Sequence, residues 1–300
     1  GGWAASISET ITLPSDSQLS EYDKIEVELL RGCPDSDMNY SDAGCDDYDR
    51  IARMFICDED GSNCLEITKW ITPFDRQPHS LTDITPMLAA FRPGGTKTIK
   101  FQESGWPNSL LTLKIRMYDL ENNSSSSQQI IPIWNGTVLF NPDYNDNRPP
   151  TPFVVPSNAT KVEFVTSITG HGWGSAGCFN CAEFCNSKHI FEVNGGVFEF
   201  EKAHPNASDN DYCMELSTIA QGVIPNQYGT WGYGRAGWCP GQDVKLYITD
   251  ITDVITMGDE NIIDYSACRV SGAACVTPPT CGGDGYCPEI AMFSYIIIHY

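Results

Sequence analysis

The sequence predicts an all-β protein of antiparallel strands arranged in two parts. Short runs of β-branched and aromatic residues recur between turn signals along the whole chain, and long helical patterns are hard to find. Many short strands with little helix are typical of an antiparallel sandwich or barrel. The 300 residues correspond to about two average domains, and the 41% of apolar residues excludes a disordered protein.

A polar stretch near the middle of the chain indicates where the two parts divide. Residues 122–129 read Asn-Asn-Ser-Ser-Ser-Ser-Gln-Gln, the most polar segment of the sequence. This composition is typical of a linker between domains, although a long hairpin loop inside one sandwich would look the same. We therefore expect an amino-terminal domain over residues 1–125 and a carboxy-terminal domain over residues 126–300.

Each expected strand is a run of β-forming residues between turn residues. In the first half these runs are residues 24–30, 51–57, 65–71, 97–102 and 111–118. The second and third runs form a hairpin, because the turn dipeptide Asp60-Gly61 lies between them. Cys57 and Cys64 lie where a disulfide would close the end of this hairpin. One helical turn is expected near Pro86. The second half repeats the pattern at residues 161–166, 189–193, 197–201, 244–251 and 290–298.

The charge of the chain argues against one class of partner. Eighteen Lys and Arg residues against 39 Asp and Glu residues give a formal net charge of −21. A chain this acidic repels phosphate backbones, so we expect no nucleic-acid partner. The longest apolar run, residues 290–299, is interrupted by Ser294 and is far shorter than the roughly 20 residues of a membrane span. We expect a terminal strand there, and no membrane span.

The cysteine content predicts an oxidising environment. The chain has 13 cysteines, mostly in close pairs flanked by turn residues, and this density is typical of a disulfide-bonded protein. Six Asn-x-Ser/Thr sequons, at Asn39, Asn122, Asn123, Asn135, Asn158 and Asn206, agree with this. We therefore expect a secreted or cell-surface glycoprotein. The odd number of cysteines leaves one unpaired, which would allow self-assembly through an intermolecular bond.

The segment Cys45-Asp-Asp-Tyr-Asp-Arg50 is the first candidate for catalytic chemistry. A disulfide to Cys33 would close the loop before it, and the segment opens into the strand at residue 51. Asp49 would therefore be held rigidly where that strand begins, as a catalytic carboxylate must be. The adjacent Arg50 can keep a carboxylate ionised. An acidic surface loop or a weak Ca²⁺ site is the alternative.

The segment Cys178-Phe-Asn-Cys-Ala-Glu-Phe-Cys185 allows two interpretations. Three cysteines at this spacing can bind zinc or an iron–sulfur cluster. In an oxidising compartment a short Cys181–Cys185 disulfide is favoured instead, and it would clamp the backbone around Glu183. We therefore expect a disulfide here and no metal.

Three further segments combine charged or aromatic residues with turns. Arg235-Ala-Gly-Trp-Cys-Pro-Gly241 offers an arginine to a carboxylate, a sugar or an amide oxygen. Phe101-Gln-Glu-Ser-Gly-Trp106 ends an expected strand with a glutamate near a tryptophan, a pairing that suits sugars. Ile168-Thr-Gly-His-Gly-Trp-Gly174 presents His171 and Trp173, and without a lysine it is not a phosphate loop. Each segment taken alone is also explained by a structural turn.

Together and in this order, the segments closely resemble the peptide:N-glycosidase F family. The matching strings are Cys45–Arg50, Trp70-Ile-Thr-Pro73, Ile168-Thr-Gly170, Cys181-Ala-Glu-Phe-Cys185 and Arg235–Gly241. The resemblance implies two antiparallel eight-stranded jelly rolls packed side by side, with the active site at their interface. It also implies an amidase that hydrolyses the β-aspartyl-glucosaminyl bond of N-glycosylated peptides or proteins, releasing the glycan and converting Asn to Asp.

The resemblance also implies roles for individual residues. The family's essential aspartate falls on Asp49, and its two supporting glutamates fall on Glu183 and Glu103. Arg50 and Arg235 match arginines that line the family's site. As further substrate-binding residues we expect Tyr48, Trp106, His171, Trp173 and Trp238. The glycine-rich segment reads Gly-His-Gly-Trp where the family has Gly-Trp-Gly-His, so which of its two rings faces the substrate stays open.

The resemblance accounts for part of the disulfide pattern. The family's three disulfides map onto Cys33–Cys45, Cys181–Cys185 and Cys213–Cys239. Further bonds outside the family pattern are plausible at Cys57–Cys64, Cys268–Cys275 and Cys281–Cys287. These pairs leave Cys178 as the odd cysteine.

Two other functions fit parts of the sequence. A non-catalytic glycan-binding or structural extracellular protein, such as a subunit of a glycosylated surface filament, would fit the sequons and the extra cysteines. The five matched site residues favour the enzyme instead. A copper monooxygenase fails because the five histidines, at positions 79, 171, 189, 204 and 299, include no close pair. We expect an enzyme that needs no metal and no cofactor.

Overall fold

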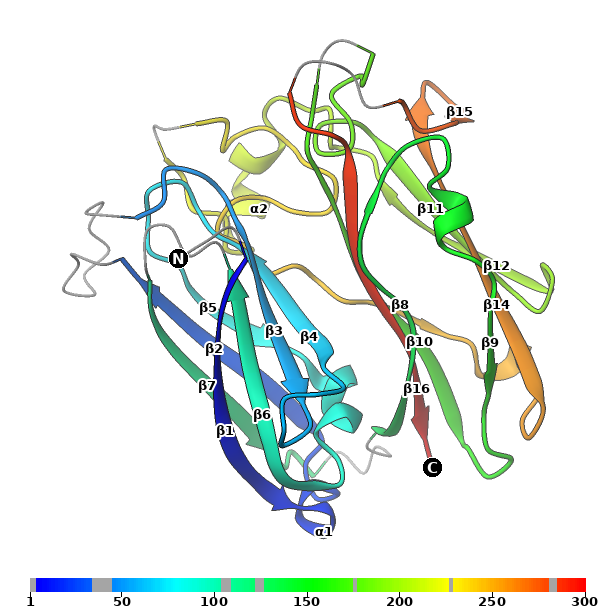
Figure 1. Cartoon of the computed structure of the whole chain (residues 1–300). Coiled ribbons are helices and arrows are strands. Elements are labelled where there is room, and N and C mark those ends of the chain that lie inside the picture. The colour runs from blue at the N-terminus through cyan, green and yellow to red at the C-terminus, as the bar shows by residue number, and fades with distance from the viewer. Residues whose placement is uncertain are drawn as a thin grey trace.

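The computed structural model describes residues 4–33, 45–103, 109–121, 127–174, 177–226, 229–280 and 285–300. Over these residues the protein is all-β, and its strands form four sheets (Figure 1). Every pairing between these strands is antiparallel. The predicted all-β, antiparallel class is therefore confirmed.

The first half of the chain forms two of the four sheets. One has the strand order β1-β6-β3-β4 and the other the order β5-β2-β7. The strands are β1 (Ala5–Ser15), β2 (Lys24–Gly32), β3 (Ile51–Cys57), β4 (Leu65–Ile71), β5 (His79–Asp83), β6 (Gly94–Glu103) and β7 (Leu110–Tyr118). The short helix α1 (Asp16–Leu19) follows β1, and the 3₁₀ helix η1 (Thr85–Phe91) buries the apolar residues that follow Pro86.

The second half forms the other two sheets. One has the order β13-β10-β16-β8, and the other has the order β12-β11-β14-β15 with β9 paired to β14. The strands are β8 (Ser127–Leu139), β9 (Thr151–Val154), β10 (Lys161–His171), β11 (Ser187–Val193), β12 (Phe198–His204), β13 (Tyr247–Asp250), β14 (Glu260–Ser271), β15 (Ala274–Val276) and β16 (Glu289–His299). Short helices are η2 (Asn145–Asn147), η3 (Tyr212–Met214), α2 (Leu216–Ile219) and η4 (Thr252–Val254).

The sheet of β13, β10, β16 and β8 joins the two halves, and its central strands β10 and β16 are buried on both faces. Along β16, Phe293, Tyr295 and Ile297 pack into the core formed with the first half. Met292 and Ile296, on the opposite face, pack into the core of the second half. Figure 1 shows this sheet between the β1–β7 sheets and the sheet that contains β11 and β14. A strand covered on both faces is apolar at nearly every position, which explains the run over residues 290–299.

The expected strands are all present, with ends that differ by a few residues. The predicted hairpin of β3 and β4 has the predicted bounds, and the helical turn at Pro86 is η1. Strands β1, β5, β8, β9, β14 and β15 were not expected, because they are short, rich in Ser, Thr and Asn, or interrupted by Pro132. Strand β10 continues through His171, where a glycine-rich loop was expected. Most of the expected linker falls on residues 122–126, which lie outside the described residues.

Five of the six expected disulfides are present. They are Cys33–Cys45, Cys57–Cys64, Cys181–Cys185, Cys213–Cys239 and Cys268–Cys275. The sixth would include Cys281, which lies outside the described residues. Cys178 is buried, and its thiol donates a hydrogen bond to the carbonyl oxygen of Thr280 at 3.5 Å. It could not reach a second chain without local opening, so self-assembly through it stays a prediction.

The disulfide bonds indicate the environment in which the chain folds. Five disulfides in one chain are typical of an oxidising compartment. In the described part of the chain, no helix combines the length and the apolar character needed to cross a bilayer.

A network of buried polar side chains crosses the core of the second half. His189 Nδ1 lies 2.7 Å from the hydroxyl of Tyr265, and Ser187 Oγ lies within hydrogen-bond distance of both His189 and His204. Burial lowers the pKa of His189 to about 3, and burial also lowers the pKa of His204 well below its usual value. Both rings are therefore neutral in the folded protein at mildly acid pH.

These two histidines should make the protein sensitive to acid. The unfolded chain binds a proton at each ring below pH 6.5, whereas the folded protein keeps His189 neutral down to about pH 3. The free energy of unfolding should therefore fall as pH drops below 6.5, by up to about 1.4 kcal/mol per pH unit for each histidine. Denaturant unfolding from pH 7 to pH 4 should show a shallower slope for His189→Gln. His79→Gln, at an exposed position, is the control, and an equal slope in both variants would contradict the expectation.

Candidate active site

A cleft of about 400 Å³ lies where the two halves of the chain meet. The first half contributes Tyr48, Asp49, Arg50, Ile51, Ile71 and Phe74 to its lining. The second half contributes His171, Trp173, Glu183, Phe184, Trp238 and Glu289, among others. Backbone hydrogen bonds join the halves beside it, from Ile71 N to Gln242 O at 3.0 Å and from Gly241 N to Ile71 O at 2.9 Å. Seven of the expected site residues, far apart in the sequence, thus meet in one cleft.

Asp49 is held by the short segment that leads into β3. Cys45 is tied to the end of β2 through its disulfide to Cys33. The carboxylate of Asp46 accepts hydrogen bonds from the backbone N–H of Tyr48 at 3.0 Å and from Arg50 Nε at 2.8 Å. Arg50 is therefore paired with Asp46 rather than with Asp49, as part of the support of this segment. Asp49 is left facing the cleft.

Glu183 is held from three directions. The Cys181–Cys185 disulfide closes the turn around it. Its backbone N–H donates to the carbonyl oxygen of Gly172 at 3.0 Å, and its carbonyl oxygen accepts from the N–H of Ala236 at 2.9 Å. The turn packs so closely on β10 that a Cβ at Gly170 would lie 2.3 Å from the carbonyl oxygen of Ala182. Glycine is therefore required at that position.

Arg235 lies between the two carboxylates with its side chain fully buried. Its Nε lies 3.1 Å from Oε1 of Glu183, and its Nη2 lies 3.4 Å from Oδ2 of Asp49. Its remaining N–H groups donate to the carbonyl oxygens of Thr230 and Tyr233 and to the Thr230 hydroxyl, at 2.7 to 3.0 Å. Four of the five donors of the guanidinium thus make hydrogen bonds, and the Asp49 contact is an ion pair rather than a hydrogen bond.

The environment raises the pKa of both carboxylates. Burial raises the pKa of Glu183 to about 7, and the negative charge of Asp49 adds to the rise. Burial likewise raises the pKa of Asp49, while the positive charges of Arg235 and Arg50 oppose it. Oδ2 of Asp49 is buried and accepts no hydrogen bond from the described residues. Two such groups sharing one cation are suited to hold a single proton near neutral pH.

Aromatic rings form the walls of the cleft. His171 stacks on Trp238 with ring centroids 5.2 Å apart, and the indole N–H of Trp238 donates to Gly170 O at 2.8 Å. Burial, followed by nearby positive charges, lowers the pKa of His171 well below its usual value, so this ring is neutral. Trp173 and Tyr48 are 43% and 60% exposed, which leaves their faces open to a ligand.

Three expected site residues are not found in the lining, and one of them, Arg235, is fully buried beside Asp49 and Glu183. Glu103 is buried, and Nε and Nη2 of Arg31 donate to its carboxylate at 2.6 to 2.9 Å. It does not line the cleft, although the charges of Asp46 and Arg50 act on it. Burial raises the pKa of this carboxyl group. Trp106 lies outside the described residues.

The structure adds residues that the sequence did not indicate. Phe74, Thr230, Tyr286 and Glu289 line the cleft. Glu289 could have been found only from the strand register, because it pairs with His171 where β16 meets β10. The others come from turns whose composition carries no signal. The described residues contain no group of three or more His, Cys, Asp or Glu that could hold a metal ion.

Fold and cleft together define a disulfide-bonded all-β protein with a paired-carboxylate site between its halves. Comparison with family models identifies the family. The model described as "Peptide-N-glycosidase F, C terminal" matches residues 140–296, more than half of the chain. The protein belongs to the peptide-N-glycosidase F family.

Individual relatives agree with this assignment. Peptide-N(4)-(N-acetyl-beta-D-glucosaminyl)asparagine amidase F from Elizabethkingia miricola is 23% identical over 282 residues, which cover 85% of this chain and 70% of the relative. The structure of PNGase F from Flavobacterium meningosepticum superposes with a TM-score of 0.72 at 19% identity, covering 98% of this chain and 89% of that one. The structure of PNGF-II superposes with a TM-score of 0.69 at 13% identity, covering 98% of this chain and 60% of that one.

Removing the guanidinium should perturb both carboxylates at once. In Arg235→Met the pKa of Glu183 should rise above 7, because a buried positive charge is lost. The free energy of unfolding should fall by about 3 kcal/mol, because two buried carboxylates lose their partner. Carbon-13 NMR titration of the glutamate carboxyl groups and denaturant unfolding measure the two effects.

Two further variants control this experiment. Arg235→Lys keeps the charge but not the planar fork, so it should destabilise the fold while raising the pKa of Glu183 less. Arg116→Met removes an exposed arginine and should leave the pKa of Glu183 unchanged. A lower pKa of Glu183 in Arg235→Met would contradict the role given to Arg235.

Proposed function

We propose that the protein is an amidase that hydrolyses the β-aspartyl-glucosaminyl bond of N-glycosylated peptides or proteins. The reaction would release the whole glycan and convert Asn to Asp. The observation that carries this proposal is the pair Asp49 and Glu183, held on the two sides of Arg235 at a cleft that can admit a ligand. The family membership and the amidase activity named for the relatives support it.

Asp49 is the primary catalytic group in this proposal. Amides are weak electrophiles, so hydrolysis needs a base for the water, stabilisation of charge and a proton for the leaving nitrogen. Oδ2 of Asp49 is a buried acceptor without a hydrogen-bond partner among the described residues, so it can take the proton of a bound water. The water oxygen bonds to the amide carbon, and the C–N bond then breaks.

Glu183 supplies the proton in the same step. Its raised pKa of about 7 keeps it protonated around neutral pH, when Asp49 beside it carries the negative charge. The proton passes to the leaving nitrogen, which departs as a glycosylamine. Arg235 keeps Asp49 ionised and holds the two carboxyl groups apart at fixed positions. No step requires a metal or a cofactor.

The other expected residues take supporting roles. Arg50 lies 5.2 Å above the Tyr48 ring, and this pair forms a wall for the first sugars and the amide. His171, Trp173 and Trp238 also line the cleft and offer further ring surfaces to the sugars. Glu103 acts as a supporting carboxylate through its charge rather than by touching substrate. Trp106 remains a proposed sugar contact on the basis of the sequence.

The family also guides three broader proposals. We propose that residues 1–125 and 126–300 are two domains, each an eight-stranded jelly roll, packed side by side. Two of the four sheets are formed by each half of the chain, which supports this division.

We also propose that the protein is secreted or displayed outside the cell, where N-glycoproteins are its partners, and the five disulfides support this. A purely structural or glycan-binding role is not favoured, because the site residues are retained.

Replacing Asp49 should abolish glycan release without unfolding the protein. Asp49→Asn keeps the size of the side chain but removes the base, so kcat should fall by at least about 100-fold. Mass spectrometry of a denatured N-glycopeptide after incubation detects the conversion of Asn to Asp together with loss of the whole glycan. Asp47→Asn, at the exposed neighbouring position, is the matched control and should keep full activity.

Two outcomes would count against the amidase. If Asp49→Asn keeps activity within about tenfold of the wild type, Asp49 is not the base. If correctly disulfide-bonded wild-type protein converts no glycopeptide from a broad panel, the protein binds glycans or serves a structural role instead.

The pH profile tests the role of Glu183. In the wild type, kcat/KM should fall as pH rises through about 7, because Glu183 loses the proton that it donates. It should also fall at acid pH as Asp49 takes up a proton. Glu183→Gln should lower kcat and remove the fall on the alkaline side, measured on the same glycopeptide. A fall near pH 7 that persists in Glu183→Gln assigns the proton donor to another group.

A further inference from the structure

A second cavity, of about 320 Å³, adjoins the cleft and has no role in the reaction described above. Trp173, Phe184 and Thr230 line both spaces, so the two share a wall. Glu183 and Phe184 are consecutive, and one contributes its carboxylate to the site while the other contributes its ring to the cavity. The cavity is therefore next to the site, one residue along the chain from Glu183.

Three aromatic rings shape this cavity. Phe184 meets Trp173 edge to face with centroids 6.5 Å apart, and it meets Tyr233 in the same way at 6.2 Å. Trp173 and Tyr233 are 43% and 45% exposed, so their faces are open to a ligand. Their open faces offer apolar area against which a ligand can pack.

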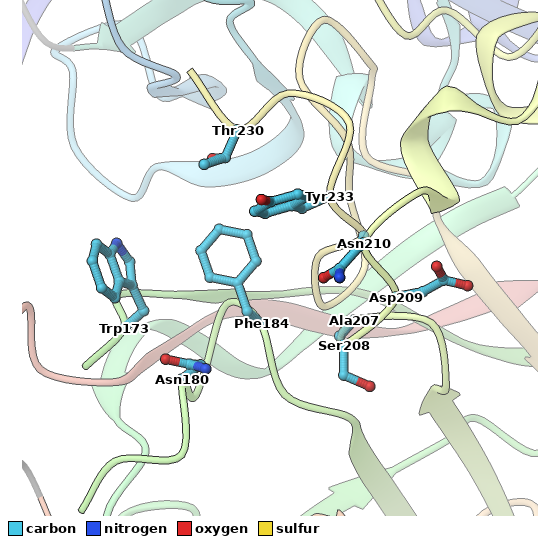
Figure 2. Close-up of a pocket in the computed structure, with 10 residues that line it drawn as sticks. Trp173, Asn180, Phe184, Ala207, Ser208, Asp209, Asn210, Thr230 and Tyr233 are labelled. Carbon is cyan, nitrogen blue, oxygen red and sulfur yellow. The ribbon is translucent and has the colours of Figure 1, made fainter. Parts of the chain in front are cut away.

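Polar side chains surround the rings. Figure 2 shows Asn180 on one side of Phe184 and Asn210 on the other, with the carboxylate of Asp209 farther out and directed away from the rings. Amide groups both donate and accept hydrogen bonds, and a carboxylate accepts them, which matches a ligand rich in hydroxyl groups. Among the described residues that line the cavity none is basic, and Asp209 is acidic. The cavity therefore disfavours an anionic ligand.

The backbone around the cavity argues against a peptide. Its described lining comes from turns and bends over residues 177–185, 205–214 and 229–234 and from the segment just after β10. No strand edge among these residues offers the row of N–H and C=O groups that binds an extended chain. Apolar faces with a polar rim fit a sugar ring, which has C–H groups on its faces and hydroxyls at its edge.

We propose that this cavity is a subsite for a neutral sugar residue of the N-glycan, beyond the sugars at the reacting amide. This inference rests on the proposed amidase function. The subsite is coupled to the reaction centre, because the carbonyl oxygens of Thr230 and Tyr233 accept hydrogen bonds from Arg235 at 3.0 and 2.7 Å. A sugar on Tyr233 thus orders the turn that positions Arg235.

The first test compares two substrates with the same peptide. One carries a full neutral glycan and the other a single N-acetylglucosamine. In Tyr233→Leu and Asn210→Ala, the ratio of kcat/KM for the full glycan to that for the single sugar should fall about tenfold. Leu216→Ala, at a highly exposed position outside the cavity, is the control and should leave the ratio unchanged.

The second test measures binding without catalysis. Asp49→Asn protein should bind a free neutral oligosaccharide, detected by tryptophan fluorescence, and adding Tyr233→Leu should weaken this binding about tenfold. A sialylated oligosaccharide should bind less tightly, because Asp209 lies in the cavity.

The outcomes separate the two proposals. If wild-type protein cleaves neither substrate, the amidase function fails, whatever the binding result. If it cleaves both and the ratio in the cavity variants stays that of the wild type, the subsite proposal alone is overturned. If Tyr233→Leu leaves the affinity of Asp49→Asn protein for the free oligosaccharide unchanged, the cavity does not bind the sugar and the subsite proposal is overturned too.

Discussion

A single buried guanidinium organises the site. A charged group removed from water must find a partner for each of its donors, or its burial costs several kcal/mol. Arg235 meets this demand with two carboxylates and two main-chain carbonyl groups from one turn. Because the acceptors come from both halves of the chain, satisfying this arginine fixes where the halves meet. The same contacts set the charge balance between Asp49 and Glu183.

The cleft depends equally on a sheet that belongs to two cores. Because β16 packs alternate residues into two different cores, a shift by one residue would place each set of side chains in the core that fits the other set. Lys69, buried between the halves, donates to the carbonyl oxygen of Ala291 in β16 at 3.1 Å, and the hydroxyl of Tyr295 donates to Glu66 O at 3.0 Å. These contacts make the boundary between the two halves a rigid part of the fold. Side chains held on the two sides of this boundary can therefore be positioned as precisely as side chains on a single sheet.

Much of this arrangement could be predicted from the sequence, and the rest depended on long-range contacts. Asp49, Glu183 and Arg235 stand in short strings that contain cysteines, and although each string alone is also explained by a structural turn, their order along the chain resembles the family. Glu103 looked equally suitable, but Arg31, 72 residues away, withdraws its carboxylate from the cleft. Phe74 also lines the cleft, but it lies in a turn, and nothing in the composition of that turn marks it as part of a site. Strand β14 was missed although its buried and exposed residues alternate, because several of its residues are polar.

The disulfides have a consequence for where and when the protein can act. Both loops that carry the paired carboxylates are closed by a bond, Cys33–Cys45 before Asp49 and Cys181–Cys185 around Glu183. Such bonds form in oxidising compartments and are rare in a reducing cytosol. A newly made chain therefore lacks the clamps on both halves of its site until it is oxidised. Assembly of the site therefore depends on an oxidising environment, because only there are both carboxylate loops closed.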